Sequence, residues 1–217
     1  MDSPIVVNYE YTNNLYKAKQ WLFNLPDLFA ADFEVASKYT RKEKELIKHR
    51  LANYKLAFEK ERVLLQQLTS DGLSHPSLTV ITHLSVGWTD RDSKVIVCDT
   101  ERIRMLVLEF LITTDKRQLW HNCVFDFKHI FYHTGVLPQN YTDTQLLAKA
   151  LLNDADSFKD RTGLKDLMSY AYGAWGISKD DFTLEEMWTE DMLKYAATDS
   201  CACMKLYNDI LEDLTVS

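Results

Sequence analysis

Leu28-Phe29-Ala30-Ala31-Asp32-Phe33-Glu34-Val35 is the stretch of sequence that decides the fold. A short apolar run of this kind, following the Pro26-Asp27 turn signal, predicts a buried strand. Residues two apart on a strand project from the same face, so the carboxylates of Asp32 and Glu34 lie side by side at one edge of the core. This pair is half of a metal site.

Further strands and helices are predicted on both sides of this stretch. The apolar runs and turn signals indicate strands at 5–7, 78–88, 94–98 and 118–121, with a hairpin between the second and third of these. Helical patterns cover about 14–24, 101–113, 125–133, 143–152, 163–172 and 190–214. The order predicts an α/β fold in which a mixed β-sheet is flanked by α-helices.

Residues 38–76 are predicted to form a basic helical insertion. Thr40 and Glu43 make a capping-box pattern, and Asp71-Gly72 supplies a stop signal. Between Lys38 and Arg62 there are nine basic and four acidic residues, in a chain whose net charge is -7. We favour a solvated helix face, and the alternative is a surface that guides single-stranded DNA or docks on a polymerase.

Composition limits the classes of protein that fit. The length of 217 residues suits a single domain spanning 1–217, without a Gly/Ser-rich linker to divide it. An acidic chain does not hold nucleic acid by bulk phosphate neutralisation, so any contact with DNA is local. The sequence has neither a signal peptide nor an apolar run long enough for a membrane span, and its four cysteines lack zinc-site spacing. We expect a cytoplasmic protein.

Three further acidic positions complete the candidate site. Asn122 to Asp126 reads Asn-x-x-Phe-Asp where a strand ends and a helix begins, and Tyr195 shares a helix face with Asp199 four residues later. Asp143 fits either a helix N-cap or a carboxylate that supports the metal ligands, and both alternatives stay open. The second Asp-x-Glu, at residues 99–101, is assigned instead to a helix N-cap at Asp99 or Thr100.

In order and spacing, these motifs resemble those of the DnaQ-like, or DEDD, 3′→5′ exonuclease superfamily. Tyr195, four residues before Asp199, matches the tyrosine branch. The resemblance covers nearly the whole chain and looks closest to the proofreading domain of family A DNA polymerases of bacteria and their phages. The stretches 141–147 and 164–167 support it, whereas Val35 in place of a common Thr and the long 38–76 insertion depart from it.

The resemblance implies a ribonuclease H-like fold and a catalytic set consisting of Asp32, Glu34, Asp126, Tyr195 and Asp199. The four carboxylates would hold two divalent cations, Mg²⁺ or Mn²⁺, with Asp32 shared by both ions. Oxygen ligands suit these cations, and converging carboxylates repel each other without them. Tyr195, with an ordinary pKa near 10, is expected to orient the attacking water rather than act as a base. Nucleotide contacts are expected from Phe33, Val35, Asn122 and Phe125.

The expected activity is release of nucleoside 5′-monophosphates from DNA 3′ ends. The expected substrate is single-stranded DNA or a frayed primer end, with a DNA polymerase as partner and no membrane contact. We expect a proofreading subunit or an excised polymerase domain. Two alternatives remain: an RNase D-like exoribonuclease that uses the same carboxylates, and a non-catalytic module that binds nucleic acid or a polymerase.

Overall fold

One mixed sheet forms the centre of the protein. The structure, a computed structural model, describes residues 6–39, 42–43, 75–151, 162–172, 184 and 187–216. The strand order is β1-β4-β3-β2-β5-β6, in which β2 and β4 run antiparallel to β3 and the other neighbours are parallel. The strands are β1 (Asn8–Thr12), β2 (Leu28–Ser37), β3 (Thr79–Gly87), β4 (Asp92–Val97), β5 (Arg117–Trp120) and β6 (Tyr141–Asp143).

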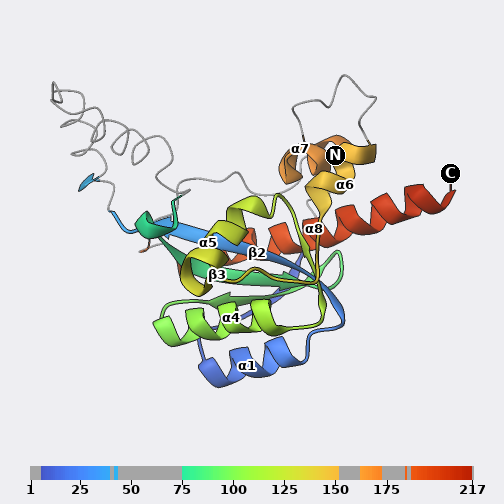
Figure 1. Cartoon of the computed structure of the whole chain (residues 1–217). Helices are drawn as coiled ribbons and strands as arrows, with labels where there is room; N and C mark the ends of the chain where they lie inside the picture. Colours follow the sequence, from blue (N-terminus) through green and yellow to red (C-terminus); the bar gives the residue numbers. More distant parts are fainter. Residues whose placement is uncertain are drawn as a thin grey trace, which may run out of the picture.

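Helices cover both faces of the sheet, which confirms the predicted α/β class. Helices α1 and α4 lie together on one face, and α8 packs on β2, β3 and β4 from the other (Figure 1). The helices are α1 (Leu15–Phe23), α4 (Glu101–Thr113), α5 (Val124–Thr134), α6 (Thr144–Leu151), α7 (Leu164–Tyr172) and α8 (Glu190–Val216), with a 3-10 helix η1 (Pro76–Leu78) before β3. None of the helices in the described ranges is long and apolar enough to cross a bilayer.

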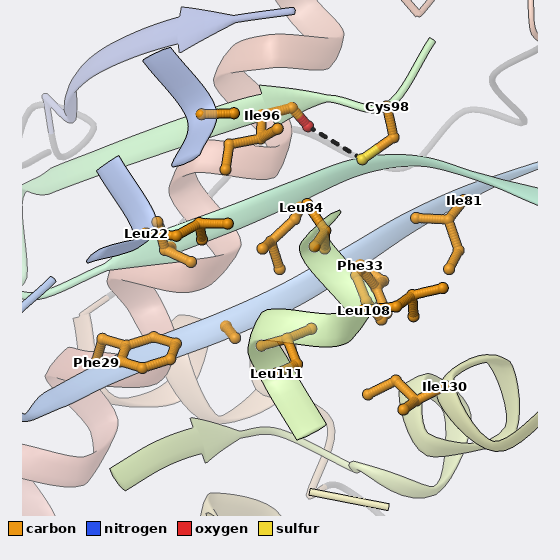
Figure 2. Close-up of a cluster of buried hydrophobic side chains, with 14 of the residues drawn as sticks. Leu22, Phe29, Phe33, Ile81, Leu84, Ile96, Cys98, Leu108, Leu111 and Ile130 are labelled. Atoms are coloured by element: carbon orange, nitrogen blue, oxygen red, sulfur yellow. Dashed lines mark hydrogen bonds between the residues drawn. The ribbon is translucent and has the colours of Figure 1, made fainter. Parts of the chain in front are cut away.

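The core on the α1 and α4 face takes alternate side chains of β2. Phe29 and Phe33 are buried there with Leu22 of α1 and Leu111 of α4 (Figure 2). Successive strand residues point to opposite faces, so the neighbours of these phenylalanines must point toward α8. Burial of this apolar surface is the main force that fixes the register of β2.

The opposite face of β2 begins apolar and becomes acidic. Ala30 packs against Cys203 and Met204 of α8, and the next two residues on that face are Asp32 and Glu34. The acidic residues therefore lie under the N-terminal half of α8, which carries Tyr195 and Asp199.

One predicted strand is displaced in the structure, and one strand was missed. The strand expected at 5–7 is β1 at Asn8–Thr12, because pairing with β4 begins at Asn8, whereas Val7 precedes the ladder and packs against Val95. Strand β6 was not predicted, since its three residues are ordered only by pairing with β5. The hairpin β3–β4 and the remaining helices are confirmed within one or two residues. The long helix expected from residue 40 lies outside the described residues, apart from positions 42 and 43.

Candidate active site

Three carboxylates from two elements meet above β2. Oxygen atoms of Asp32, Glu34 and Asp199 all lie within 4.8 Å of one another. No other group of three or more His, Cys, Asp or Glu side chains in the described part of the chain is arranged to hold a metal ion. Glu34 is 2% exposed, and Asp32 and Asp199 are half-buried. The structure thus joins residues that the sequence separates by more than 160 positions.

Close contact between β3 and α8 holds Asp199 over the sheet. Gly87 ends β3, and a Cβ at this position would lie 2.9 Å from the backbone carbonyl carbon of Ser200. The hydroxyls of Ser93 and Ser200 lie 2.9 Å apart in a buried hydrogen bond. Because Ser200 follows Asp199, these contacts set the height of Asp199 above β2.

A β-bulge fixes the backbone at Glu34. The register between β2 and β3 shifts between Glu34 and Val35, and Thr82 has no Cα partner there. The Thr82 hydroxyl donates a hydrogen bond to the Glu34 carbonyl oxygen at 3.0 Å. The extra residue of this bulge is Thr82 of β3, so the bulge lies beside Glu34, whose carboxylate meets those of Asp32 and Asp199.

Asp126 reaches the same strand from α5. It is 3% exposed, and its Oδ1 accepts a hydrogen bond from the Phe33 backbone N–H at 3.1 Å. Asp126 is outside the three-carboxylate group, yet it contacts the residue between Asp32 and Glu34. Asp126 of α5 thus lies beside the middle of β2, next to the group that Asp32 and Glu34 form with Asp199 of α8.

Asp143 supports the start of α5 and also caps α6. Its Oδ1 accepts hydrogen bonds from the N–H groups of Asn122 at 3.1 Å and Gln145 at 2.8 Å, and its Oδ2 accepts one from Cys123 at 3.0 Å. Burial alone would raise the pKa of Asp143, but these hydrogen bonds, together with one from the Cys123 thiol, hold it below its ordinary value. Asp143 therefore caps α6 and holds the turn that leads to Asp126, and its role as a support for metal ligands stays a prediction.

Tyr195 lies one helical turn before Asp199 and is 3% exposed. Burial raises its pKa above the ordinary value, and the charges of Asp199, Glu34 and Asp32 raise it further. The phenol therefore keeps its proton at neutral pH. A protonated phenol beside three carboxylates can donate a hydrogen bond but cannot serve as a base.

The four expected nucleotide contacts differ in accessibility. Asn122 is exposed, with a left-handed backbone at φ 60°, and Phe125 is half-buried at the start of α5. Phe33 and Val35 are 2% and 6% exposed, with side chains in the core on the α4 face. The structure does not support substrate contact by these two side chains, because the strand turns them away from Asp32 and Glu34.

Lys165 of α7 was not predicted as a site residue. Its ammonium donates a hydrogen bond to the Tyr195 hydroxyl at 2.6 Å and lies 4.0 Å from Asp199 Oδ2. The stretch 164–167 supported the family resemblance, but no local pattern connects it with Tyr195, thirty residues further along the chain. Only the packing of α7 on α8 brings the two together.

The arrangement suits divalent cations bound by oxygen. Like charges at about 4 Å repel each other by about 4 kcal/mol at an effective dielectric near 20. A set of carboxylates without nitrogen or sulfur ligands matches Mg²⁺ or Mn²⁺ better than zinc. The residues present therefore fit the cations that the sequence led us to expect.

Comparisons with known proteins agree with this geometry. A family model described as 3′-5′ exonuclease matches residues 108–215, which include Asp126, Tyr195 and Asp199. No curated protein matches the sequence. NrnC of Brucella melitensis with bound Mg²⁺ has a similar structure, with 17% identity and a TM-score of 0.57, covering 99% of this chain and 83% of that one.

Two RNase D structures share the fold as well. RNase D of Trypanosoma brucei has 16% identity and a TM-score of 0.63, covering 94% of this chain and 64% of that one. RNase D of Escherichia coli has 14% identity and a TM-score of 0.58, covering 97% of this chain and 46% of that one. The chain thus spans about half the length of the Escherichia coli enzyme.

The family match and the shared fold identify the protein as an enzyme of the 3′→5′ exonuclease class. Its fold is the ribonuclease H-like α/β fold that these solved structures share.

Proposed function

We propose that the protein removes nucleotides one at a time from a single-stranded 3′ end, with two divalent cations, Mg²⁺ or Mn²⁺, held by Asp32, Glu34, Asp126 and Asp199. The observation that carries this proposal is the convergence of three carboxylates to within 4.8 Å on the face of β2. The Mg²⁺ bound to the similarly folded NrnC supports the choice of cation.

Each residue around the carboxylates has a separate role. When bound, the cations neutralise the scissile phosphate and activate the attacking water. Tyr195 keeps its proton, and its hydroxyl orients that water by hydrogen bonding. Asn122 and Phe125 hold the terminal nucleotide, since an aromatic ring stacks on any base and an exposed amide hydrogen-bonds to it. The product is a nucleoside 5′-monophosphate.

Direction and product are tested with a 5′-labelled single-stranded oligonucleotide and Mn²⁺. We expect a ladder that shortens from the 3′ end one nucleotide at a time, with 5′-monophosphates released. Blocking the 3′ end should abolish the ladder, and Asp32→Asn provides the inactive control. Internal cuts, dinucleotide products or equal activity of Asp32→Asn would contradict the proposal.

We propose DNA as the substrate, in a proofreading role beside a DNA polymerase, because of the resemblance of the motifs to polymerase proofreading domains. RNA is a second candidate, favoured by the shared fold with RNase D, which has been solved in complex with the RNA U12 and with GMP. NrnC has been solved in complex with pGG, so we include short oligonucleotides in this second candidate.

Four oligonucleotides of one sequence separate DNA from RNA: all DNA, all RNA, DNA with a single 3′-terminal ribonucleotide, and RNA with a single 3′-terminal deoxynucleotide. A DNA exonuclease should favour the first, and a 3′-mismatched primer should be trimmed faster than a matched one. Higher kcat/KM on all-RNA, and equal rates on matched and mismatched primers, would replace the proofreading proposal with the ribonuclease one.

A further inference from the structure

Lys165 is placed against the hydroxyl of Tyr195. Its Nζ lies 2.6 Å from the Tyr195 oxygen, 3.9 Å from the centre of the tyrosine ring and 4.0 Å from Asp199 Oδ2. The Lys165 side chain is 35% exposed and that of Asp199 is 14% exposed, so solvent weakens this ion pair. The short contact with Tyr195 is the more specific of the two interactions.

The direction of this hydrogen bond determines where the tyrosine proton points. An ammonium group has three donors and no acceptor, whereas a phenol has a single donor. Lys165 must therefore donate, and the Tyr195 oxygen must accept. The single O–H of Tyr195 therefore points away from Lys165 and hydrogen-bonds with Asp199, on the side of Asp32 and Glu34.

Contacts at both ends of its first turn hold α7 in place. The Thr162 carbonyl oxygen, before the helix, lies 2.9 Å from His121 Nε2 and accepts a hydrogen bond from Gln145 Nε2 at 3.2 Å. On the other side, Leu167 packs in a cluster with Ile210 of α8. Lys165 lies between these anchors, so its stem is directed at α8 by the fold.

We propose that Lys165 is a positioning residue of the exonuclease site, which fixes the Tyr195 hydroxyl as a donor toward the attacking water. This inference rests on the proposed function. Without Lys165, the tyrosine O–H can also rotate toward the space that the ammonium occupied, away from Asp199, and fewer of its orientations are productive. The cations still bind, since every carboxylate that would hold them is unchanged.

The chain offers a matched control for this residue. Lys205 on α8 makes the same kinds of contact elsewhere: its Nζ lies 3.0 Å from Asp209 Oδ1 and 4.4 Å from the ring centre of Tyr172. Lys205→Met thus removes a lysine from a similar trio of Lys, Tyr and Asp outside the carboxylate group.

Steady-state kinetics at saturating Mn²⁺ test the proposal in Lys165→Met, Lys165→Arg and Lys205→Met. Lys165→Met should lower kcat about 10- to 100-fold with KM changed less than about threefold, because substrate contacts are retained. Lys165→Arg keeps a cationic donor and should recover part of the rate, and Lys205→Met should match the wild type. The Mn²⁺ concentration for half-maximal rate should stay constant or fall in Lys165→Met, since a cation beside Asp199 has been removed.

A double-mutant cycle with Tyr195→Phe completes the test. If Lys165 acts through the hydroxyl, adding Lys165→Met to Tyr195→Phe should lower kcat less than about twofold further. If the two substitutions lower kcat by factors that multiply in the double variant, the proposal is overturned. A Lys165→Met enzyme with normal kcat and only a changed Mn²⁺ requirement would also overturn it, because Lys165 would then serve merely as a counter-ion. A wild-type enzyme without exonuclease activity would instead refute the proposed function.

Discussion

Tyr195 is the residue whose chemistry is most constrained by its surroundings. Its burial and the three carboxylates near it keep the phenol protonated, and a lysine donates to its oxygen. These conditions exclude proton abstraction by Tyr195 at neutral pH. The role that remains for Tyr195 is to orient the attacking water, which contributes little energy but requires the hydroxyl itself.

Tyr195→Phe should therefore lower kcat about 10- to 100-fold, while the Mn²⁺ dependence and KM stay near those of the wild type. Rapid-quench measurement of single-turnover rates would check the chemical step directly. A Phe variant as fast as the wild type would show that the hydroxyl does not take part, and a lost Mn²⁺ response would show that it helps to bind the cation.

His129 is a buried residue that the proposed chemistry does not use. It is fully buried on α5, and neither ring nitrogen has a hydrogen-bond partner among the described residues. Burial lowers its pKa to about 4, and the nearby His133, Lys128 and His75 lower it as well. A histidine with such a pKa is neutral in the folded protein over the whole range in which an unfolded histidine takes up a proton.

His129→Leu should raise the free energy of unfolding by about 1 kcal/mol at pH 7, because it removes an unsatisfied buried polar group at similar volume. Between pH 6.5 and about 4 the unfolded chain binds a proton that folded His129 does not, so the wild type loses stability as the pH falls through this window. The His129→Leu variant should lose less stability than the wild type over the same pH window.

Urea unfolding at pH 7 and pH 5 measures both effects. His133→Leu, at an exposed position of the same helix, is the control and should change stability by less than about 0.5 kcal/mol. A destabilised His129→Leu with an unchanged pH slope would show that the ring has a polar partner in solution.

At the scale of elements, the crossing of α8 over β3 decides whether the site forms. Gly87 permits the crossing, because any Cβ there would collide with the backbone of Ser200 rather than with a side chain that can move aside. The helix must shift to admit a methyl group, and Asp199 shifts with it.

Gly87→Ala should destabilise the protein by about 1–3 kcal/mol and lower kcat in the molecules that remain folded. Gly135→Ala is the matched control: its φ of 71° strains an alanine, but no atom lies within 4 Å of the added Cβ. Gly135→Ala should lower the free energy of unfolding by about 1–2 kcal/mol and leave kcat unchanged. Activity and thermal unfolding of the two variants, measured in parallel, separate strain from displacement of α8. Equal kcat values would contradict the role given to the crossing.

The elements also show what a sequence can predict. Strand β2 and the helix α4 followed from local periodicity and turn signals. Of the two N-cap candidates, Asp99 and Thr100, the structure uses Thr100, whose hydroxyl accepts a hydrogen bond from the Ile103 N–H at 3.4 Å. Strand β6 could not be predicted, since its order comes from pairing with β5. The site motifs were recognised by spacing, whereas the contact of Lys165 with Tyr195 depends on tertiary packing alone.

At the scale of the whole molecule, charge sets the conditions for binding. A chain with net charge -7 that gathers carboxylates at one site repels a phosphate backbone unless cations are bound. The basic residues between Lys38 and Arg62 lie mostly outside the described residues, and their role in guiding DNA stays a prediction. The single domain spanning 1–217 also stays a prediction. Metal binding is thus expected to come before productive binding of nucleic acid.

The most direct test of this account is a Mn²⁺ titration of EDTA-treated protein, followed by release of mononucleotides from a single-stranded oligonucleotide. We predict no release without metal, saturable release in the wild type, and a loss of at least about 100-fold in Glu34→Gln and Asp199→Asn at every Mn²⁺ concentration. Release in the presence of EDTA, or variants as active as the wild type, would show that these carboxylates are not the catalytic centre.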